Sequence, residues 1–415
     1  MLKNYIKLAV KVLRRRKFFT FISLFGISLT LVVLMVATAI LDSLLAPRAP
    51  ESRFDRVLGV YTIGIYGKSG GMTGGPGFAF LDRYVRPMQQ EPGAERVSIF
   101  TRARNAKMFH RGEKVETNLR RTDGNYWQIL DHSFVEGEPF TEHDNQRANF
   151  VAVITDEMRE KLYGGASAVG RTLEVDGQRF RIVGVVRAVP VTRFSAYSDV
   201  WVPVRTSKSR DYEKQNAGDF IALVLARSKS DMPNLQEAFQ AKLQTFVPDD
   251  PRFNEPRAGL DRPFEAAARF FTGNAESPHR TAIFRGILIT AALLFILLPT
   301  LNLVSINLSR ITERASEIGV RKAFGASSRA LVGQFVVENV VLTVIGGLIG
   351  FALAVAVIAY LNETKALANM TFDVNFRVFV YGMLLAAGFG IISGVYPAWR
   401  MARMQPVNAL RGGAV

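Results

Sequence analysis

The chain has 415 residues, a net charge of +16 and no cysteine. The lack of cysteine excludes disulfides, thiolate metal sites and a cysteine nucleophile. Hydrophobic residues make up 48% of the chain. In a soluble protein so basic a balance would suggest a nucleic-acid partner, but most of the excess lies beside apolar segments, where anionic lipid is the expected partner. We therefore expect no nucleic acid among its partners.

Four uncharged segments are each long enough to cross a bilayer. An α-helix of about 22 to 24 residues covers the roughly 30 Å hydrocarbon core with a little tilt. We predict an integral membrane α-helical protein with four transmembrane helices, arranged one plus three, at residues 18–41, 286–309, 339–362 and 378–399. Between the first and second helices, residues 42–285 form an insertion that is large enough to fold as an extracytoplasmic domain.

Basic residues set the expected orientation. Residues 1–17 are rich in lysine and arginine and contain no acid, and residues 2–13 have the periodicity of an amphipathic helix. The positive-inside rule then places the N-terminus in the cytoplasm, and four crossings return the C-terminus there. We predict a cytoplasmic helix at 1–17, a cytoplasmic loop at 310–338, an extracytoplasmic loop at 363–377 and a cytoplasmic tail at 400–415.

The insertion alternates strand and helix patterns. Residues 56–65 alternate like a strand, residues 78–90 have helical periodicity, and the glycine-rich residues 67–77 between them predict a mobile loop. Further expected strands lie at 96–100, 149–155, 171–177, 179–186 and 220–226, and further helices at 156–163, 234–246 and 264–271. Because the middle section, residues 102–204, is mostly β, we predict a large α+β domain with two lobes and a β-rich insertion between them.

The motifs predict no catalytic or metal site. Gly67-Lys68-Ser69 resembles the end of a phosphate-binding loop, but Thr62 stands where that motif needs its opening glycine. Glu142-His143-Asp144 holds three potential metal ligands, yet consecutive side chains point apart, so a solvated loop is expected. The histidines have no spacing that would bring two to one helical face, at His110, His132, His143 and His279. We predict no catalytic residue, no metal and no cofactor bound by this chain.

Small residues recur at four-residue spacing in two of the predicted membrane helices. The third helix contains Gly346 and Gly350. The fourth contains the stripe Gly382, Ala386, Gly390 and Gly394. In lipid, apolar side chains gain nothing by leaving the bilayer, so close backbone approach at small residues drives helix association. We predict helix-packing contacts at all of these positions. The stripe of the fourth helix is expected to pair two subunits, with contact inside one subunit as the alternative.

The loop after the second predicted span has the pattern of a short charged helix. Apolar residues recur along one edge of residues 311–318, and Glu317 precedes Arg321 by four positions, which supports a helix. Gly325 is placed to end that helix. An amphipathic helix on the cytoplasmic surface suits the docking of a soluble partner.

Residues 313–326 read ERASEIGVRKAFGA and fit the pattern E-R-x-x-E-I-G-x-R-x-A-x-G-A at every fixed position. In this the chain resembles the FtsX-like permeases of ABC transporters, and in particular the macrolide-exporter (MacB-like) type. The insertion segments DGNYWQIL, GEPFTEHD and VAVITDEMREKLYGG are similar to the periplasmic core domain of that family. The tail is similar to it at Pro397-Ala398, Ala402, Pro406 and Ala409-Leu410-Arg411.

The resemblance implies a dimeric permease of two identical or two related chains in a bacterial inner membrane, with the large domain in the periplasm. The cytoplasmic loop would dock on a pair of ABC ATPase subunits, which bind ATP and Mg²⁺. The macrolide exporter carries its ATPase at its own N-terminus, whereas only residues 1–17 precede the first span here. We therefore expect a separate ATPase polypeptide. The expected coupling residues are Glu313, Arg314, Glu317, Ile318, Arg321, Lys322 and Gly325.

These inferences predict the permease subunit of an ATP-driven exporter or extractor, in which ATP hydrolysis elsewhere moves the periplasmic domain. Membrane lipid and a periplasmic adaptor protein are further expected partners. The alternative is a mechanotransmitting signalling protein that activates a cell-wall hydrolase or senses peptides. An enzyme of the outer face is disfavoured because the sequence lacks a catalytic constellation.

Overall fold

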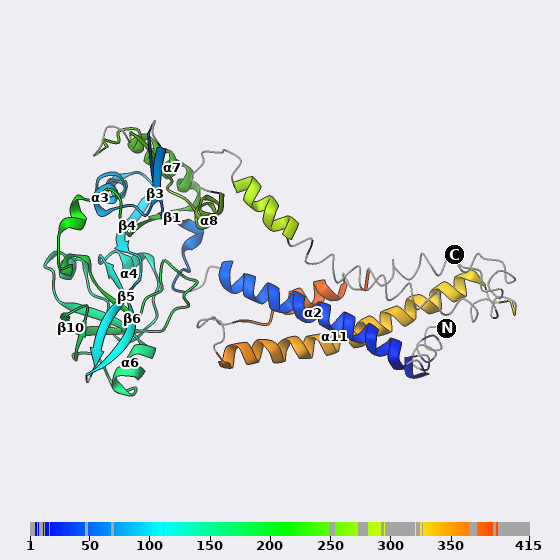
Figure 1. Cartoon of the computed structure of the whole chain (residues 1–415). Coiled ribbons are helices and arrows are strands. Elements are labelled where there is room, and N and C mark those ends of the chain that lie inside the picture. The colour runs from blue at the N-terminus through cyan, green and yellow to red at the C-terminus, as the bar shows by residue number, and fades with distance from the viewer. Residues whose placement is uncertain are drawn as a thin grey trace. The chain divides into compact units, whose positions relative to one another are not determined.

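The computed structural model describes residues 5, 7, 11, 13–15, 17–45, 49–67, 70–110, 112–248, 254–272, 281–291, 294, 320, 324–325, 327–364, 372–384 and 387–388. The chain divides into two compact units. The first, here called the helical unit, comprises Met1–Leu45, Ile287–Leu367 and Thr371–Val415. The second, the α+β unit, comprises Ala46–Gly286 and Ala368–Met370 (Figure 1).

The first sheet of the α+β unit is antiparallel and has the order β1-β12-β4. Its strands are β1 (Val57–Val60), β12 (Phe220–Ala226) and β4 (Ala94–Thr101). Every residue of the central strand β12 is buried, as its continuous apolar sequence predicts. One face packs on α3 (Phe78–Tyr84), η2 (Arg86–Gln90) and α7 (Met232–Leu243), around Phe80, Met88 and Phe239. The predicted helix 78–90 is thus interrupted at Val85, shortly before Pro87.

A second, three-stranded sheet has the order β13-β2-β3, with β13 (Glu255–Ala258), β2 (Ile63–Gly67) and β3 (Gly70–Gly74). The single strand predicted at 56–65 is therefore wrong, because the chain leaves the first sheet after Val60 and enters this one at Ile63. The glycine-rich stretch predicted as a loop is largely strand β3. The ring of Tyr66 lies over Gly71, where a Cβ would be 2.0 Å from Tyr66 Cδ1.

The third sheet has seven strands, six of which close into a barrel, while β7 pairs only with β10. Its order is β7-β10-β8-β11-β6-β5-β9, and β9 also pairs with β10. The strands are β5 (Arg104–His110), β6 (Glu113–Thr122), β7 (Phe134–Gly137), β8 (Val151–Thr155), β9 (Thr172–Val175), β10 (Gln178–Val186) and β11 (Val200–Pro203). A single residue pair, Met108 with Val175, joins β5 to β9. Helix α6 (Asp156–Tyr163) has the predicted bounds, with Thr155 as N-cap and the left-handed Gly164 as C-cap.

A shared hydrophobic cluster joins the barrel to the first sheet. It includes Leu223 of β12, Val153 of β8 and Trp201 of β11, together with Tyr126 and Trp127 of α4. The remaining elements are η1 (Phe54–Arg56), α4 (Tyr126–Ile129), α5 (Glu142–Gln146), η3 (Val204–Thr206), η4 (Asp211–Lys214), η5 (Lys229–Asp231) and α8 (Pro263–Thr272). This cluster therefore joins the first sheet to the barrel within the α+β unit.

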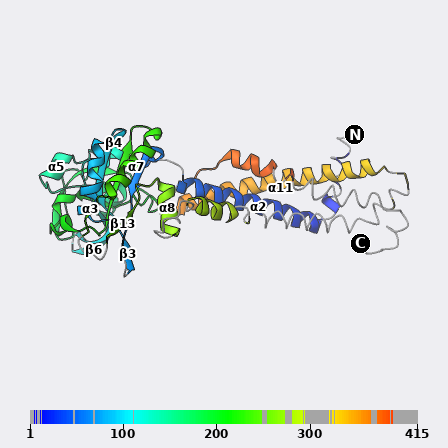
Figure 2. The same cartoon turned by 90° about the horizontal axis from the view of Figure 1, so that it is seen from above.

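The helical unit is dominated by two long helices, α2 (Lys17–Leu45) and α11 (Ser328–Thr364). They run side by side in both views (Figures 1 and 2). Within the described residues, two segments are long and apolar enough to cross a membrane, Thr20–Ile40 and Val332–Thr364. They correspond to the first and third predicted spans. A shorter apolar helix covers Thr281–Ala291. The rest of the second and fourth predicted spans lies largely outside the described residues.

Candidate functional site

The turn after the predicted coupling segment is the part of that region which the structure describes. Gly325 has a φ of 89°, a left-handed conformation that favours glycine. The N–H of Phe324 donates to the carbonyl of Val320 at 3.1 Å, one helical turn earlier. Ser327 Oγ accepts the N–H of Ala330 at 3.3 Å at the start of α11. The left-handed Gly325 therefore lies shortly before α11, which begins at Ser328.

Most of the predicted coupling residues lie outside the described residues, namely Glu313, Arg314, Glu317, Ile318, Arg321 and Lys322. Their role stays a prediction. Sequence reasoning missed Phe324, whose side chain is 88% exposed at this turn. An exposed aromatic ring is the kind of anchor that protein interfaces favour. The signal in the sequence was its position, directly before the glycine that ends the helical turn.

Two of the predicted packing glycines bring α11 against α2. A Cβ at Gly346 would lie 2.9 Å from Ile27 Cγ2, and one at Gly350 would lie 2.9 Å from the carbonyl oxygen of Ser28. The Ser28 hydroxyl donates to the carbonyl of Gly346 at 2.8 Å. The two backbones therefore approach where any larger residue would separate them.

Gly382 also faces α2, since a Cβ there would lie 2.8 Å from Leu31 Cδ2. This contact lies inside one chain, so Gly382 gives no support to the predicted pairing of two subunits. The other stripe positions, Ala386, Gly390 and Gly394, lie outside the described residues. The sequence analysis missed Gly347, where a Cβ would lie 2.0 Å from Met383 Sδ.

Two buried ion pairs lie in the α+β unit, one near its first residues and one between residues 261 and 269. The first joins Glu51 to Arg193 at 3.0 Å, and each side chain is only 8% exposed. Burial raises the pKa of Glu51, and the nearby Arg193 opposes that rise. The second joins Asp261 to Arg269 through two hydrogen bonds of 2.5 and 2.8 Å. Sequence reasoning missed both pairs. The partners of the first pair, Glu51 and Arg193, are far apart in the chain.

His132 and Asp123 are two of the buried titratable groups in and beside the core between the barrel and the first sheet. The ring of His132 lies 5.3 Å from that of Trp127 and 5.3 Å from that of Trp201. Burial lowers the pKa of His132 to about 3, and the charge of Arg120 adds to this. Burial raises the pKa of Asp123 to about 6. Asp123 accepts the N–H of Ile99 at 2.8 Å on the outer edge of β4.

The acidic cluster predicted as a solvated loop is a short helix. Residues Glu142–Gln146 form α5, with a capping box between Thr141 and Asp144. Glu142 Oε2 accepts the N–H of Gly124 at 2.8 Å. These carboxylates therefore serve local structure. In the part of the chain that the structure describes, no group of three or more acidic or histidine side chains is placed to hold a metal ion.

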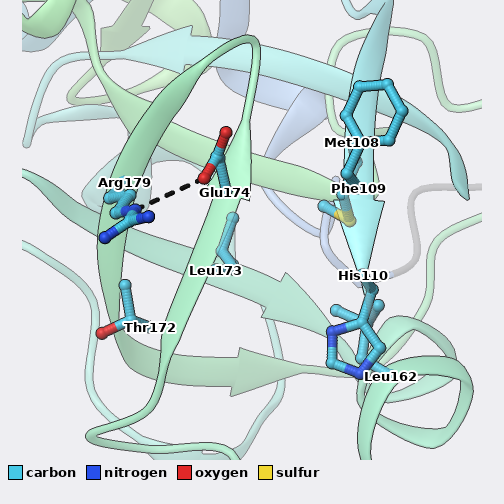
Figure 3. Close-up of a pocket in the computed structure, with 8 residues that line it drawn as sticks. All are labelled: Met108, Phe109, His110, Leu162, Thr172, Leu173, Glu174 and Arg179. Carbon is cyan, nitrogen blue, oxygen red and sulfur yellow. Dashed lines mark hydrogen bonds and ion pairs between the residues drawn. The ribbon is translucent and has the colours of Figure 1, made fainter. Parts of the chain in front are cut away.

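A hollow of about 350 Å³ lies between β5 and β9 (Figure 3). Met108, Leu162 and Leu173 give it an apolar floor, while Glu174 and Arg179 form an exposed ion pair of 3.3 Å at its side. The remaining lining residues are Phe109, His110 and Thr172. This lining contains no nucleophile placed beside a base, so it offers no catalytic arrangement.

Comparison with known proteins gives two domain matches and several relatives. Residues 20–242 match the MacB-like periplasmic core domain, and residues 289–406 match the FtsX-like permease C-terminal domain. The uncharacterized ABC transporter permease YknZ of Bacillus subtilis is 26% identical over 80% of this chain and 79% of its own length. The macrolide export ATP-binding/permease protein MacB of Bdellovibrio bacteriovorus is 27% identical over 69% of this chain.

This chain covers 42% of the length of that MacB relative. A solved extracellular domain of YknZ from Gram-positive bacteria aligns with a TM-score of 0.32 at 19% identity, over 43% of this chain and 90% of that domain. The two domain matches together extend across most of the chain, and the first alone covers more than half of it. The chain belongs to the FtsX-like, MacB-like family of ABC transporter permeases, membrane proteins that carry an extracytoplasmic core domain.

Proposed function

We propose that this chain is the permease subunit of an ABC transporter whose separate ATPase subunits drive export or extraction of a substrate by moving the α+β unit. ATP and Mg²⁺ are bound by the ATPase, and this chain binds no cofactor of its own. Two permease chains, identical or related, form the membrane part. A periplasmic adaptor protein and membrane lipid complete the set of proposed partners.

The observation that carries this proposal is the close packing of α2 against α11, the helix that follows the turn at Gly325. The turn with the exposed Phe324 leads directly into α11. Helix α11 is fixed to α2 through the close contacts at Gly346 and Gly350. Helix α2 ends at Leu45, and the chain then enters the α+β unit. A displacement at the turn therefore moves α11 and α2 together, because packed helices transmit strain.

The proposed topology has four membrane spans, with both termini in the cytoplasm and the α+β unit in the periplasm of a bacterial inner membrane. Its basis is the basic N-terminal segment and the positive-inside rule. The chain has no cysteine, so single cysteines report the side of the membrane directly. A cysteine at Lys214 should react with an impermeant thiol reagent in cells with a permeabilised outer membrane, and one at Ser327 should not. Labelling at Ser327 alone would invert the topology.

The test of the coupling role uses the full-length chain purified in mild detergent with the ATPase that accompanies it. Reversing two charges, Glu317→Arg with Arg321→Glu, should release the ATPase and abolish the ATP hydrolysis that the complex performs. Phe324→Ala should weaken the same association. The matched control is Glu363→Arg, a charge reversal at the opposite end of α11. Retention of the ATPase and of its activity in the double variant would refute the coupling assignment.

A further inference from the structure

Residues near the start of the α+β unit contact its barrel. Among these contacts is the ion pair between Glu51 and Arg193, in which Arg193 Nη1 donates to Glu51 Oε2 at 3.0 Å. Arg193 belongs to the segment that leads from β10 into β11, two strands of the barrel. The pair therefore ties the residues that follow the first membrane helix directly to the barrel.

The neighbouring ion pair of the same segment, unlike Glu51–Arg193, is exposed. Arg53 pairs with Asp131 at 2.8 Å, but both side chains are 37% exposed. Pro50 accepts the N–H of Asp131 at 2.8 Å. Water and salt screen an exposed ion pair, whereas burial shields a pair from both. Of the two ion pairs, Glu51–Arg193 is therefore the one that burial shields from water and salt.

The loop that carries Arg193 is itself held rigidly. Arg120 of β6 is 1% exposed and donates to the carbonyl of Phe194 at 2.6 Å and to that of Tyr197 at 2.9 Å. The Arg120 guanidinium also lies 5.2 Å from the centroid of the Phe100 ring. Because Arg120 fixes the loop to β6, a displacement of Glu51 acts on the barrel and is not absorbed by the loop.

The second buried ion pair, Asp261 with Arg269, is connected to the first, Glu51 with Arg193. Gly59 of β1 forms an antiparallel bridge with Asp261, which pairs with Arg269 of α8. A Cβ at Gly59 would lie 2.5 Å from the ring of Tyr61, so this ring covers Gly59. The same ring contacts Phe194, beside Arg193, edge-on at 5.4 Å. Tyr61 thus bridges the segments that carry the two buried ion pairs.

We propose that Glu51 and Arg193 are a positioning pair, which transmits displacement of the first membrane helix to the barrel. This inference rests on the proposed function and assigns a role to two residues within it. A hydrogen-bonded ion pair fixes direction and distance between its partners. An apolar contact of similar volume preserves burial but is non-directional, so it lets the two segments slide. Stability and coupling can therefore be separated by substitution.

The experiment uses the full chain in complex with its ATPase, in detergent. Spin labels at cysteines replacing Lys161, in α6 beside barrel strand β8, and Glu363, at the end of α11, report the distance between them. The probe is ATP with vanadate, so no transported substrate is needed. In the natural background we expect this distance to shift on ATP and vanadate addition. In Glu51→Leu with Arg193→Met, most of the shift should be lost, while ATP hydrolysis and the unfolding temperature are retained.

The matched control is another Glu–Arg pair in the barrel region, which shares no residue with the two buried ion pairs. Glu136 and Arg159 lie 2.5 Å apart and are about one fifth exposed. Glu136→Leu with Arg159→Met should leave the distance shift unchanged. A full shift in the Glu51 and Arg193 variant would overturn the positioning role. Absence of any shift and of ATP hydrolysis in the natural background would instead count against the proposed function, so the two failures are distinguishable.

A single-residue series covers the case in which the double variant does not fold. Glu51→Gln keeps the shape of the side chain and a hydrogen-bonding group but removes the charge. It should lose part of the shift, and Arg193→Lys, which keeps the charge without the planar fork, should do the same. Equal, full shifts in both single variants would also overturn the inference.

Discussion

The α+β unit and the helical unit achieve close packing with opposite kinds of residue. In the α+β unit, large side chains fill the space between sheets, as Trp201, Tyr126 and Phe239 do without any exposure. In the helical unit, α2 and α11 approach where side chains are missing, at Gly346 and Gly350. Water drives the first arrangement by the hydrophobic effect, whereas lipid offers no such gain and rewards close backbone contact. Replacing a large residue by a small one should therefore destabilise the α+β unit most, whereas replacing a small residue by a large one should destabilise the helical unit most.

The largest expected effect tests the large-residue half of this comparison. Trp201→Ala should lower the free energy of unfolding of the α+β unit by about 3–5 kcal/mol, as for other buried Trp truncations. It removes the ring that packs on Trp127 and His132, and the N–H that donates to the hydroxyl of Tyr126 at 3.2 Å. Denaturant unfolding followed by tryptophan fluorescence and circular dichroism measures the loss. A loss below about 1 kcal/mol would show that the core collapses to fill the cavity.

The second prediction tests the small-residue half. Gly350→Leu places a side chain where a Cβ would already lie 2.9 Å from the backbone of Ser28. Overpacking of this kind costs about 1–3 kcal/mol in a packed interior. Gly333→Leu is the control on the same helix, because a Cβ there meets no atom within 4 Å. Thermal unfolding of the two variants in detergent should separate them, and equal melting temperatures would contradict the contact between α2 and α11.

The third prediction concerns acid stability. Folded His132 has a pKa of about 3, so it stays neutral at pH values where the unfolded residue, with a pKa near 6.5, takes up a proton. Stability from this residue is therefore present above pH 6.5 and falls by up to about 1.4 kcal/mol per pH unit below it. His132→Phe keeps an aromatic ring and removes this dependence. Unfolding free energies at pH 7 and pH 5 should differ less in the variant than in the natural chain.

The Asp123 carboxyl has the opposite pH dependence. Its pKa is raised to about 6, so its contribution is fully present below pH 3.8, the ordinary pKa of an aspartate, and is lost as the pH rises through about 6. Asp123 is present in the natural chain and in the His132→Phe variant, so its effect cancels when their unfolding free energies are compared. Parallel pH curves for the natural chain and the His132 variant would show that burial does not keep His132 neutral.

Local patterns in the sequence predicted those elements that depend on local interactions. Strand β12 and helix α6 have the predicted bounds because one is a continuous apolar run and the other begins at a capping threonine and ends at a glycine. The family resemblance was confirmed by both domain matches. The single strand at 56–65 was wrong because Tyr61 and Thr62 carry no local signal for a change of sheet. Strand β3 was missed because its glycines pair only once β2 is present.

The functional residues divide in the same way. Gly325 was found from its position after a helical pattern, and the structure gives it a left-handed conformation. The ion pair of Glu51 with Arg193 joins residues from distant parts of the chain, so no window of sequence could reveal it. The role of Gly382 could not be chosen from spacing either. The spacing shows that small residues share one face of a helix. Only the fold shows that α2 lies against that face.

The strand order of the first sheet has a consequence for synthesis of the protein. Its central strand β12 begins at Phe220, whereas its flanking strands β1 and β4 are complete by Thr101. All strands of the barrel lie between them in the chain. As the chain emerges from its N-terminus, β1 and β4 have no partner until the barrel has emerged in full. During this interval the unpaired edges of β1 and β4 are exposed to aggregation. The interval ends when β12 pairs with both strands.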